Sequence, residues 1–522
     1  MLRGSRRRAG SPEEPVAVAK SSRAHEAVLG VDLGTSESKV CLVTVAGEVI
    51  RAVREGYPTH SPRPAWAEQD PADWLQAVAR ATRRLLAETD FSARHIAGLA
   101  LTSAAHIGVL VDSDGAPVRR ALLWNDQRSS GEVADLERDY GAEILRRTYQ
   151  AVSTSWTLPH LLWVRRHEPE IWARTRGVLL SKDYLAAWLT GEAATDPAAA
   201  LSSQLYDATT GSWCPRLCAM VGLTTEALPP VLPATTPVGH GLTAEAAEVL
   251  GLTRGTPVIV GTVDSATELL AAGVLATGQG LVRLATAGGV ECVIPEPRPS
   301  RKLITYPHPV RPLWYCQAGT NSCASAVRWG TRILGGEGDV PFATWDAWAA
   351  ATPVGAEGLL FHPYLAGERA PQWDPHLRAS FLGATLQHGP GHFARAIYEG
   401  TAFSIRHAMS VLPTGDAGEA PLAVVGGGTR SGVWVQILAD VLNRPLLVAE
   451  EADSAGGAAL LGLVGLGLAD DLARLAATRA GRGQPVVPSA ANAARYRELF
   501  PVYVRAQAQL GPLYHEGWLT AS

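Results

Sequence analysis

Short apolar runs alternate along the chain with longer stretches whose apolar residues recur every three or four positions. The runs predict strands at residues 27–31, 39–45, 49–53 and 96–102. Residues 46–48 read as a hairpin turn, and residues 72–86 have the spacing of an amphipathic helix. Strands separated by helices indicate an α/β fold with parallel or mixed sheets.

The strand pattern restarts in the second half of the chain, after a proline-rich linker. Residues 257–261 form an apolar run with Asp264 close behind, and residues 422–425 lead into three glycines. These restarts favour two related domains that face a cleft, although chance also produces such restarts in large α/β enzymes. We predict four parts: a disordered N-terminal extension at 1–26, an N-terminal domain at 27–255, a C-terminal domain at 256–505 and a tail at 506–522.

The overall charge is close to neutral. With 46 basic and 50 acidic residues among 522, the formal net charge is −4. A nucleic-acid binder that depends on a basic surface is therefore disfavoured. The hydrophobic share of 47% against a charged share of 18% is typical of a globular protein. No apolar run approaches the ~18–20 residues that cross a bilayer, so no membrane association is expected.

The first 26 residues and the cysteines bear on the compartment. Arg6-Arg7-Arg8 resembles a twin-arginine export signal, but no long apolar stretch follows it. We interpret the segment as a disordered extension or a wrongly assigned start. The six cysteines are scattered, without a second pair at metal-binding spacing, which favours a reduced, cytoplasmic compartment.

Lysine is scarce, and one lysine lies in a segment suited to phosphate. The four lysines are Lys20, Lys39, Lys182 and Lys302, and the other basic residues are arginine. Residues 32–39 combine a carboxylate at a strand end, a glycine, hydroxyl groups and Lys39. Backbone N–H donors, a cation and a carboxylate for Mg²⁺ are what a phosphate-binding hairpin needs. An ordinary β-turn is the alternative interpretation.

Two further segments have the composition of nucleotide-binding loops. Thr286 lies among small residues after the apolar run 280–284, where a tight hairpin is an equally good interpretation. Three glycines at 426–428 lie between a predicted strand and a predicted helix at 433–442. Glycines there let a flat ring or a phosphate approach the helix N-terminus, so a functional role is favoured.

Asp264 follows a buried strand at the predicted start of a helix. A carboxylate in that position can act as a general base and take a proton from a substrate hydroxyl. A helix N-cap is the commoner role of such an aspartate and stays open as the alternative.

The order of these segments resembles the FGGY family of carbohydrate kinases, and within it the xylulokinase-like group. The resemblance extends from about residue 27 to about residue 504 and rests on the joint order of the motifs. The matching stretches are residues 30–35, 66–71, 123–128, 182–192, 261–264, 363–371, 381–399 and 426–440.

The resemblance implies a fold and an activity. The fold is a two-domain α/β fold of the sugar kinase/actin/heat-shock chaperone (ribonuclease H-like) type, with a cleft between duplicated domains. The activity is phosphoryl transfer from ATP, with Mg²⁺, to a sugar hydroxyl, with a pentulose such as D-xylulose expected as substrate. Another ketose, a polyol or a sugar acid stays open, and a homodimer is compatible with the family.

The resemblance also assigns residues by position. Asp264 would be the catalytic base beside the sugar, and Asp32 would organise Mg²⁺. The residues implied for ATP and its phosphates are Gly34, Thr35, Ser36, Lys39, Thr286, Gly427, Gly428 and Ser431. The residues implied for the sugar are His106, Trp124 and Asp126, together with Asp264.

Three departures from the family pattern stand out. Ala104-Ala105 replace the Gln-Met that usually precedes the histidine, His160 replaces a lysine, and Ala285 replaces a glycine. The first change adjoins the sugar site, so it puts the substrate in question more than the chemistry. A catalytically weak sugar and nucleotide sensor is the alternative class. A nicotinamide dehydrogenase is disfavoured, because no GxGxxG follows the first strand.

Overall fold

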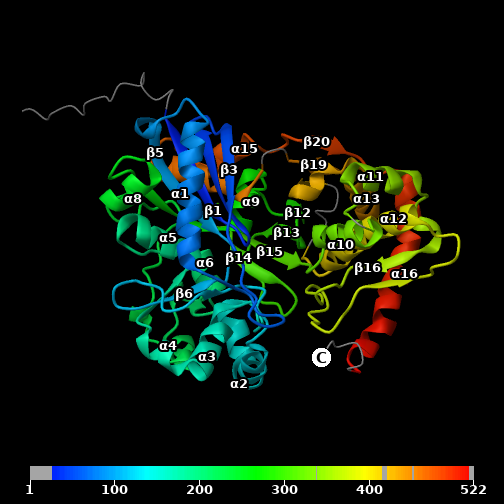
Figure 1. Ribbon diagram of the computed structural model, residues 1–522, viewed down its shortest axis with the longest axis horizontal. Helices are drawn as coiled ribbons and strands as arrows, with labels where there is room; N and C mark the ends of the chain where they lie inside the picture. Colours follow the sequence, from blue (N-terminus) through cyan, green and yellow to red (C-terminus); the bar gives the residue numbers. More distant parts are fainter. Residues whose placement is uncertain (1–25, 337, 414–419, 450–451, 517–522) are drawn as a thin grey trace, which may run out of the picture.

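The computed structural model describes residues 26–336, 338–413, 420–449 and 452–516. Two α/β domains lie side by side, each built around its own sheet (Figure 1). The blue-to-cyan part of the chain builds most of one domain, and helix α16 (Ala490–Tyr514) lies at the outer edge of the other (Figure 1). The predicted extension lies, apart from Glu26, outside the described residues.

The first sheet has five strands in the order β11-β5-β1-β2-β3. β1 is parallel to β5, which is parallel to β11, whereas β2 is antiparallel to both β1 and β3. The strands are β1 (Ala27–Leu33), β2 (Glu37–Thr44), β3 (Val49–Gly56), β5 (Ile96–Ser103) and β11 (Val258–Val263). They confirm the strands predicted from the apolar runs.

Helix α1 (Pro71–Ala87) confirms the helix predicted at 72–86. It begins where the Asp70 carboxylate accepts the backbone N–H of Ala72 at 3.0 Å, with a proline in its first turn. An aspartate cap and a proline at the first position both favour a helix start.

The second sheet has seven strands in the order β14-β15-β13-β12-β18-β19-β20. Its centre is parallel between β12, β18 and β19, and the remaining pairs are antiparallel. The strands are β12 (Gly280–Leu284), β13 (Gly288–Ile294), β14 (Ile304–Pro307), β15 (Trp314–Gly319), β18 (Leu422–Val425), β19 (Leu446–Val448) and β20 (Gln484–Val486). Helices α12 (Pro390–Met409) and α13 (Gly432–Leu442) cover it and share its core.

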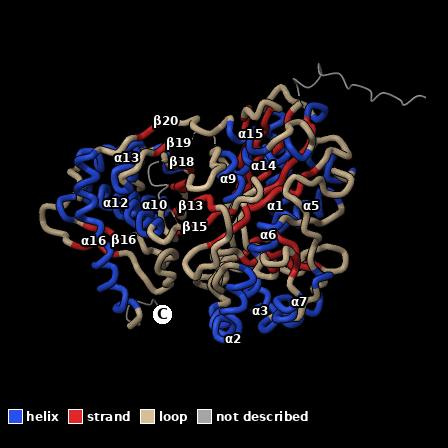
Figure 2. The backbone as a smooth tube through the Cα atoms, turned by 180° about the vertical axis from the view of Figure 1, so that it is seen from behind, coloured by secondary structure: helices blue, strands red, loops and turns tan. Residues whose placement is uncertain are grey.

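The boundary predicted between residues 255 and 256 does not separate the two sheets. β11 pairs with β5 in the first sheet, and α9 (Asp264–Ala271) follows it directly. α14 (Ser454–Gly465) also packs on the first sheet, so closely that a Cβ on Gly30 would lie 1.7 Å from the carbonyl oxygen of Ala455. Figure 2 shows α9, α14 and α15 together beside this domain. β11, α9 and α14 therefore belong to the first domain by their packing, although they follow the predicted boundary in the chain.

The tail predicted at 506–522 is likewise not separate along its whole length. α16 continues as a helix to Tyr514, and its buried side chains include Tyr496 and Tyr503. Residues 517–522 lie outside the described part of the chain.

Shorter elements complete both domains. The other helices are α2 (Ser130–Thr148), α3 (Thr157–His167), α4 (Pro169–Arg174), α5 (Ser181–Thr190), α6 (Pro197–Ser202), α7 (Pro215–Val221), α8 (Ala244–Leu250), α10 (Ala324–Leu334), α11 (Phe342–Ala351) and α15 (Leu472–Ala477). The short strands are β4 (Glu68–Gln69), β6 (Gly108–Val111), β7 (Ala121–Leu122), β8 (Gly177–Leu180), β9 (Tyr206–Asp207), β10 (Ser212–Trp213), β16 (Leu360–His362) and β17 (Ser380–Leu382). None of the described helices is long and apolar enough to span a membrane.

Candidate active site

The first candidate phosphate loop is the hairpin turn between β1 and β2. The backbone N–H of Gly34 donates to the carbonyl of Glu37 at 3.1 Å, and the hydroxyl of Tyr57 donates to the carbonyl of Gly34. Ser36 is exposed at the tip and Thr35 is half-buried. Hydrogen bonds at Gly34 thus fix the turn, while the side chains of Thr35 and Ser36 remain accessible to a ligand.

A cluster of carboxylates lies behind this turn. Burial, and after it the charges of Asp264, Asp453 and Glu268, raise the pKa of Asp32 well above its ordinary value. Lys39 offsets part of this effect and forms an ion pair with Asp453. The Oδ1 atom of Asp32 is buried without a hydrogen-bond partner. The cluster therefore concentrates more negative charge than its own cations neutralise.

The donor chemistry of this cluster fits Mg²⁺. Hard carboxylate oxygens are the ligands that Mg²⁺ prefers, and it is often held by one or two carboxylates with water and substrate phosphates. Among the described residues, no group of three His, Cys, Asp or Glu side chains could hold a metal ion. Asp32, with its unpartnered oxygen, is the residue suited to hold the ion together with a nucleotide.

We expect Asp32→Asn to stabilise the ligand-free protein while removing activity. The amide carries no charge for its neighbours to repel, so the free energy of unfolding should rise by about 1–3 kcal/mol. Urea unfolding, without and with Mg²⁺ and ATP, measures this. The wild-type protein should gain stability from the two ligands, and the variant should gain clearly less; equal gains would contradict the assignment.

Asp264 is the first residue of α9, one position after the N-cap residue Val263. Its Oδ1 accepts the adjacent N–H of Ser265, at 2.8 Å. Burial raises the pKa of Asp264, and the nearby guanidinium of Arg283 acts against that rise. The carboxylate therefore does not act as the cap of α9 and keeps the capacity to accept a proton.

Arg283 is a residue that the sequence reasoning missed. It belongs to β12 of the second sheet and pairs with Glu268 on α9 and with Glu291 on β13, at 2.8 Å for the latter. This arrangement brings a cation of the second domain next to Asp264. The signal that could have identified Arg283 is its position as an arginine inside an otherwise apolar strand.

The second candidate phosphate loop is the β12–β13 hairpin. The side chain of Thr286 is exposed, and its Oγ1 accepts from Nη2 of Arg328 at 3.0 Å. Its carbonyl accepts the N–H groups of Cys323 and Ser325 near the start of α10. The backbone of this loop is therefore fixed and its hydroxyl faces outward.

The glycine loop lies directly against this hairpin. Gly426 has a φ of 96°, and a Cβ there would lie 2.7 Å from the carbonyl oxygen of Leu284. A Cβ on Gly428 would meet the ring of Trp434 at 2.6 Å, whereas one on Gly427 would meet nothing. Gly427 is exposed, so open space remains above it. The loop thus leaves the backbone at Gly427 open to close approach by a ligand.

Ser431 has a structural role at the start of α13. Its Oγ accepts the N–H of Trp434 at 3.1 Å and donates to Asp346 Oδ1 at 2.7 Å. The same aspartate oxygen accepts the hydroxyl of Tyr398 at 2.6 Å. The hydroxyl of Ser431 is thus engaged within the protein and begins the helix next to the glycine loop.

His106 lies where the first domain meets the second sheet. Its backbone is left-handed, with a φ of 73°, and its ring packs edge-on against Trp156 at 4.2 Å between centroids. Nδ1 lies 3.1 Å from the carbonyl of Ser202, and Nε2 lies 3.4 Å from the hydroxyl of Tyr306. Burial lowers the pKa of His106 to about 3, so the imidazole is neutral at physiological pH.

Trp124 joins the predicted sugar side to the first phosphate loop. Its indole Nε1 donates to Oγ1 of Thr35 at 3.0 Å. The carbonyl of Thr35 accepts from Nε2 of Gln69 at 2.7 Å, and Oε1 of Gln69 accepts from Trp74. Trp124 and Gln69 therefore fix the position of Thr35.

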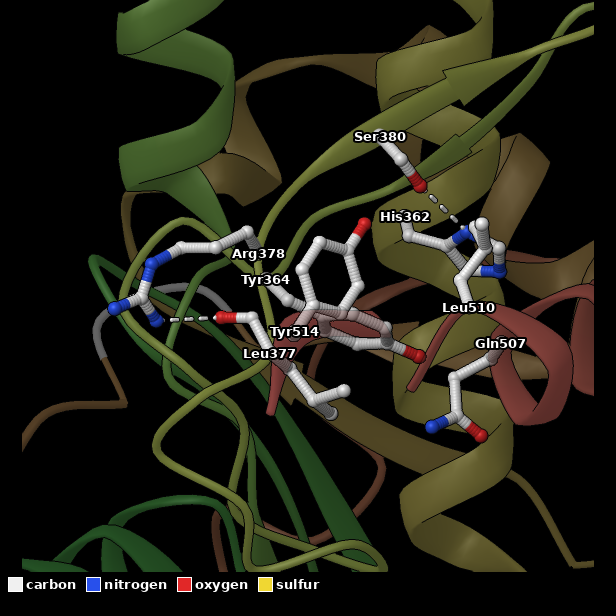
Figure 3. Close-up of a pocket in the computed structure, with 8 residues that line it drawn as sticks. All are labelled: His362, Tyr364, Leu377, Arg378, Ser380, Gln507, Leu510 and Tyr514. Atoms are coloured by element: carbon white, nitrogen blue, oxygen red, sulfur yellow. Dashed lines mark hydrogen bonds between the residues drawn. The ribbon is translucent and has the colours of Figure 1, made fainter. Parts of the chain in front are cut away.

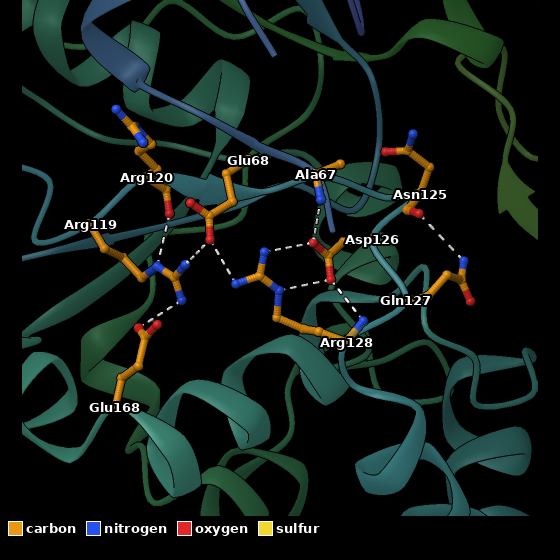
Figure 4. Close-up of polar contacts among 9 residues, drawn as sticks. All are labelled: Ala67, Glu68, Arg119, Arg120, Asn125, Asp126, Gln127, Arg128 and Glu168. Atoms are coloured by element: carbon orange, nitrogen blue, oxygen red, sulfur yellow. Dashed lines mark hydrogen bonds and ion pairs between the residues drawn. The ribbon is translucent and has the colours of Figure 1, made fainter. Parts of the chain in front are cut away.

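The carboxylate of Asp126, a predicted sugar contact, is engaged within the protein. It is fully buried, and its two oxygens accept from the backbone N–H of Ala67 at 2.6 Å and from the backbone, Nε and Nη2 of Arg128 at 2.8–2.9 Å. Arg128 also pairs with Glu68 at 2.7 Å, as Figure 4 shows. Through these contacts Asp126 and Arg128 hold residues 67–68 against the loop that carries Trp124, and a role for Asp126 at the sugar stays a prediction.

We expect Arg128→Met to lower the free energy of unfolding, because the buried carboxylates of Asp126 and Glu68 then lose the guanidinium that pairs with both. Removing one member of a buried ion pair costs about 3–5 kcal/mol. Chemical denaturation measures the loss. Arg138→Met is the control, since its pairs with Asp135 and Asp139 are exposed and should contribute little to stability. A loss as small as that of the control would show that the cluster is not needed.

Two cavities lie away from these loops. One, of about 200 Å³, is lined by both domains and includes Trp156, which packs against His106. The other is a crevice between α16 and the β16–β17 segment (Figure 3). It is closed by internal bonds, such as that between Nδ1 of His362 and Oγ of Ser380 at 3.0 Å. The first cavity therefore lies on the Trp156 side of His106, and the second is part of the packing.

The first phosphate loop and the carboxylate cluster belong to the first domain, and the second loop and the glycine loop adjoin each other in the second. Arg283 of the second domain joins the two sets through its ion pair with Glu268. This combination defines a nucleotide-dependent enzyme that transfers a phosphoryl group, because such transfer needs positioning and charge neutralisation more than covalent chemistry.

Comparison with known proteins defines the family. Residues 27–271 match the N-terminal domain, and residues 282–466 the C-terminal domain, of the FGGY family of carbohydrate kinases. The xylulose kinase of Bacillus subtilis is 31% identical over 91% of this chain and 95% of its own. The gluconokinase of Bacillus licheniformis is 27% identical over 92% and 96%. The crystal structure of a xylulose kinase from Brucella ovis superposes with a TM-score of 0.84, at 32% identity, over 94% of this chain and 100% of that one.

The chain belongs to the FGGY family of carbohydrate kinases. It is an ATP-dependent phosphotransferase with a carbohydrate acceptor and has the two-domain fold that the resemblance implied.

Proposed function

We propose that the protein phosphorylates a pentulose, D-xylulose, with Mg²⁺ and ATP. The observation that carries the proposal is the position of Asp264. Its carboxylate does not cap α9, and it lies beside Asp32 and close to Arg283 of the other domain. Several xylulose kinases are among its relatives at about 30% identity over most of the chain, which supports this acceptor.

Each side chain then has a defined task. Asp264 accepts the proton of the attacking hydroxyl, which makes the oxygen a better nucleophile. Mg²⁺, held with Asp32, supplies charge neutralisation for the phosphates when bound. Lys39 and the backbone and hydroxyl donors of the two hairpins bind phosphate oxygens: Gly34, Thr35, Ser36 and Thr286. Gly427 and Gly428 offer a flat surface for the nucleoside, and Ser431 begins the helix beside it.

On the acceptor side, His106 and Trp124 contact the sugar. The imidazole is neutral, so it offers a directional hydrogen bond rather than a charge. Trp124 offers an apolar face to the carbon skeleton while its N–H holds Thr35. Binding of the sugar therefore acts on the same residues that place the phosphate loop.

A sugar acid is the second candidate acceptor. The gluconokinase relative is nearly as similar as the xylulose kinases, and Ala104-Ala105 leave more room beside His106 than Gln-Met would. A cytoplasmic location and a homodimer are further proposals that follow the family.

The test is the release of ADP across a panel of ketoses, polyols and sugar acids, measured by a coupled assay with Mg²⁺ and ATP. We expect the highest kcat/KM on D-xylulose. A higher value on D-gluconate would replace the first candidate by the second. Absence of turnover on every compound, with ATP binding intact, would refute the kinase activity and favour a sensor.

A further inference from the structure

Arg369 extends from the second domain to the acceptor side of the first. It follows β16 in the segment of residues 363–371, and its Cζ lies 5.3 Å from the centroid of the Trp124 ring. Its charge also contributes to lowering the pKa of His106. The guanidinium is therefore near both residues proposed to contact the sugar, although neither the phosphate loops nor Asp264 require it.

The side chain of Arg369 is held in a fixed position. Its Nη2 donates to the carbonyl of Thr320 at 2.8 Å. The guanidinium occupies the space that a side chain at position 319 would fill, since a Cβ on Gly319 would lie 2.7 Å from Cζ. A face of Trp124 completes the enclosure, in a cation–π contact. A fixed guanidinium loses little entropy when it binds a ligand.

The positive charge of Arg369 is offset only in part inside the protein, by the neighbouring carboxylate of Glu368. No acidic side chain of the described residues forms an ion pair with it, and its Nε is buried without a hydrogen-bond partner. The neighbouring Glu368 is already occupied: it accepts the N–H groups of Asn321 and Arg369 and the hydroxyl of Ser404. Burial lowers the pKa of Arg369 to about 10, so the group stays charged.

We propose that Arg369 binds the acceptor substrate through a strongly accepting oxygen, the carbonyl of a ketose or the carboxylate of a sugar acid. This inference rests on the proposed function and narrows its substrate class. A half-buried cation with a buried, unpartnered Nε–H gains most from such an oxygen, because charge-assisted hydrogen bonds are about twice as strong as neutral ones. A polyol of the same length presents a hydroxyl, a weaker partner, at that position.

The polarity of the residues around Arg369 also supports this binding role. His106 is neutral and Trp124 is apolar, so Arg369 is the charged group of this trio. A site built to bond a particular oxygen discriminates against the analogue that lacks it, since the donor is then left unpaired. Arg369 is therefore a specificity-determining residue that lies on the opposite domain from the other sugar contacts.

The test compares D-xylulose, xylitol and D-gluconate on the wild type, Arg369→Met and Arg369→Lys. Xylitol has the carbon skeleton of xylulose with a hydroxyl in place of the carbonyl. In Arg369→Met, the KM for xylulose should rise by about 10–100-fold while the KM for ATP changes by less than about twofold. The preference for xylulose over xylitol should fall towards unity. Arg369→Lys keeps the charge without the planar fork and should recover part of the loss.

Arg406→Met is the matched control. Arg406 also lies over an aromatic ring, that of Phe500 at 4.3 Å, and donates to the carbonyl of Val441 at 3.0 Å, but these contacts lie within the second domain. Its replacement should leave the sugar KM unchanged. An Arg369→Met enzyme whose sugar KM and preference match those of the control would overturn the inference.

Calorimetric binding of xylulose and gluconate to the nucleotide-free proteins separates this inference from the proposed function. If the wild type binds a sugar that Arg369→Met does not bind, the inference holds even without turnover. A larger loss for gluconate identifies the carboxylate as the group bound, and a larger loss for xylulose identifies the carbonyl. If the wild type turns over xylulose while both proteins bind it equally, the inference alone fails. If the wild type neither binds nor phosphorylates any of the three compounds, both fail.

Discussion

Replacing Asp264 by asparagine should lower kcat on the acceptor by about 10²–10⁴-fold. The amide has nearly the shape of the carboxylate but cannot take the proton from the attacking hydroxyl. The affinity for ATP should stay near that of the wild type, because the loops that bind the nucleotide do not use this side chain. Steady-state kinetics together with a nucleotide titration measure both quantities.

The control for this substitution is Asp471→Asn. Asp471 caps helix α15, where its Oδ1 accepts the N–H of Arg474 at 2.6 Å, so it represents the N-cap role that the sequence also allowed for Asp264. This control should lose a little stability and no activity. If Asp264→Asn behaved in the same way, its role would be structural and the base would lie elsewhere.

The pH dependence of kcat/KM reports on the same carboxyl. The base must be ionised, and burial raises its pKa in the folded protein. Activity should therefore fall, as the pH decreases, at a higher pH than an ordinary aspartate would give. A profile flat down to the ordinary range of aspartate would contradict the assignment. The acidic limb should be missing from the residual activity of the Asn variant.

Replacing Lys39 by alanine should lower kcat by about 10²–10³-fold, because it removes a fixed positive charge from the place where phosphate charge develops. Lys302→Ala is the control, since Lys302 is exposed and bears no proposed role. Steady-state kinetics with both variants measure the difference. Equal effects would show that the lysine at position 39 has no special part in the transfer.

Because Lys39 forms an ion pair with Asp453, a second variant is needed to separate a role at the phosphate from a role in neutralising that aspartate. Asp453→Asn removes the partner and keeps the lysine. If Lys39 serves the phosphate, this variant should retain much more activity than Lys39→Ala. If Lys39 only neutralises Asp453, the two variants should be equally impaired.

The strand and helix pattern was predicted well where local periodicity decides it. The hairpins, α1 and the strand before the triple glycine all lie at the predicted residues. The predicted boundary at 255/256 does not coincide with the division between the sheets, because β11 pairs with β5, more than 150 residues earlier in the chain, and nothing in the residues of β11 records that pairing. A proline-rich linker marks a break in secondary structure, and here it lies inside a domain.

The candidate site shows the same division. Backbone features such as the turn at Gly34 and the flat position at Gly427 follow from local composition. The direction of a side chain does not: the sequence gives no sign that the carboxylate of Asp126 is buried against Arg128. Arg283 and Arg369 were missed because their roles depend on the opposite domain, where they meet Glu268 and Trp124.

The close packing of α14 on β1 constrains how the chain can fold. Gly30 touches the backbone of Ala455, and Gly457 lies equally tight against Thr267, so the first domain has no complete core until residues 454–465 have been made. During synthesis the N-terminal sheet must therefore wait, with an apolar face exposed, for more than 400 residues. Contacts of such long range slow folding and favour aggregation of the unfinished chain. A fragment cut after α9 should accordingly need α14 supplied as a separate peptide to become soluble.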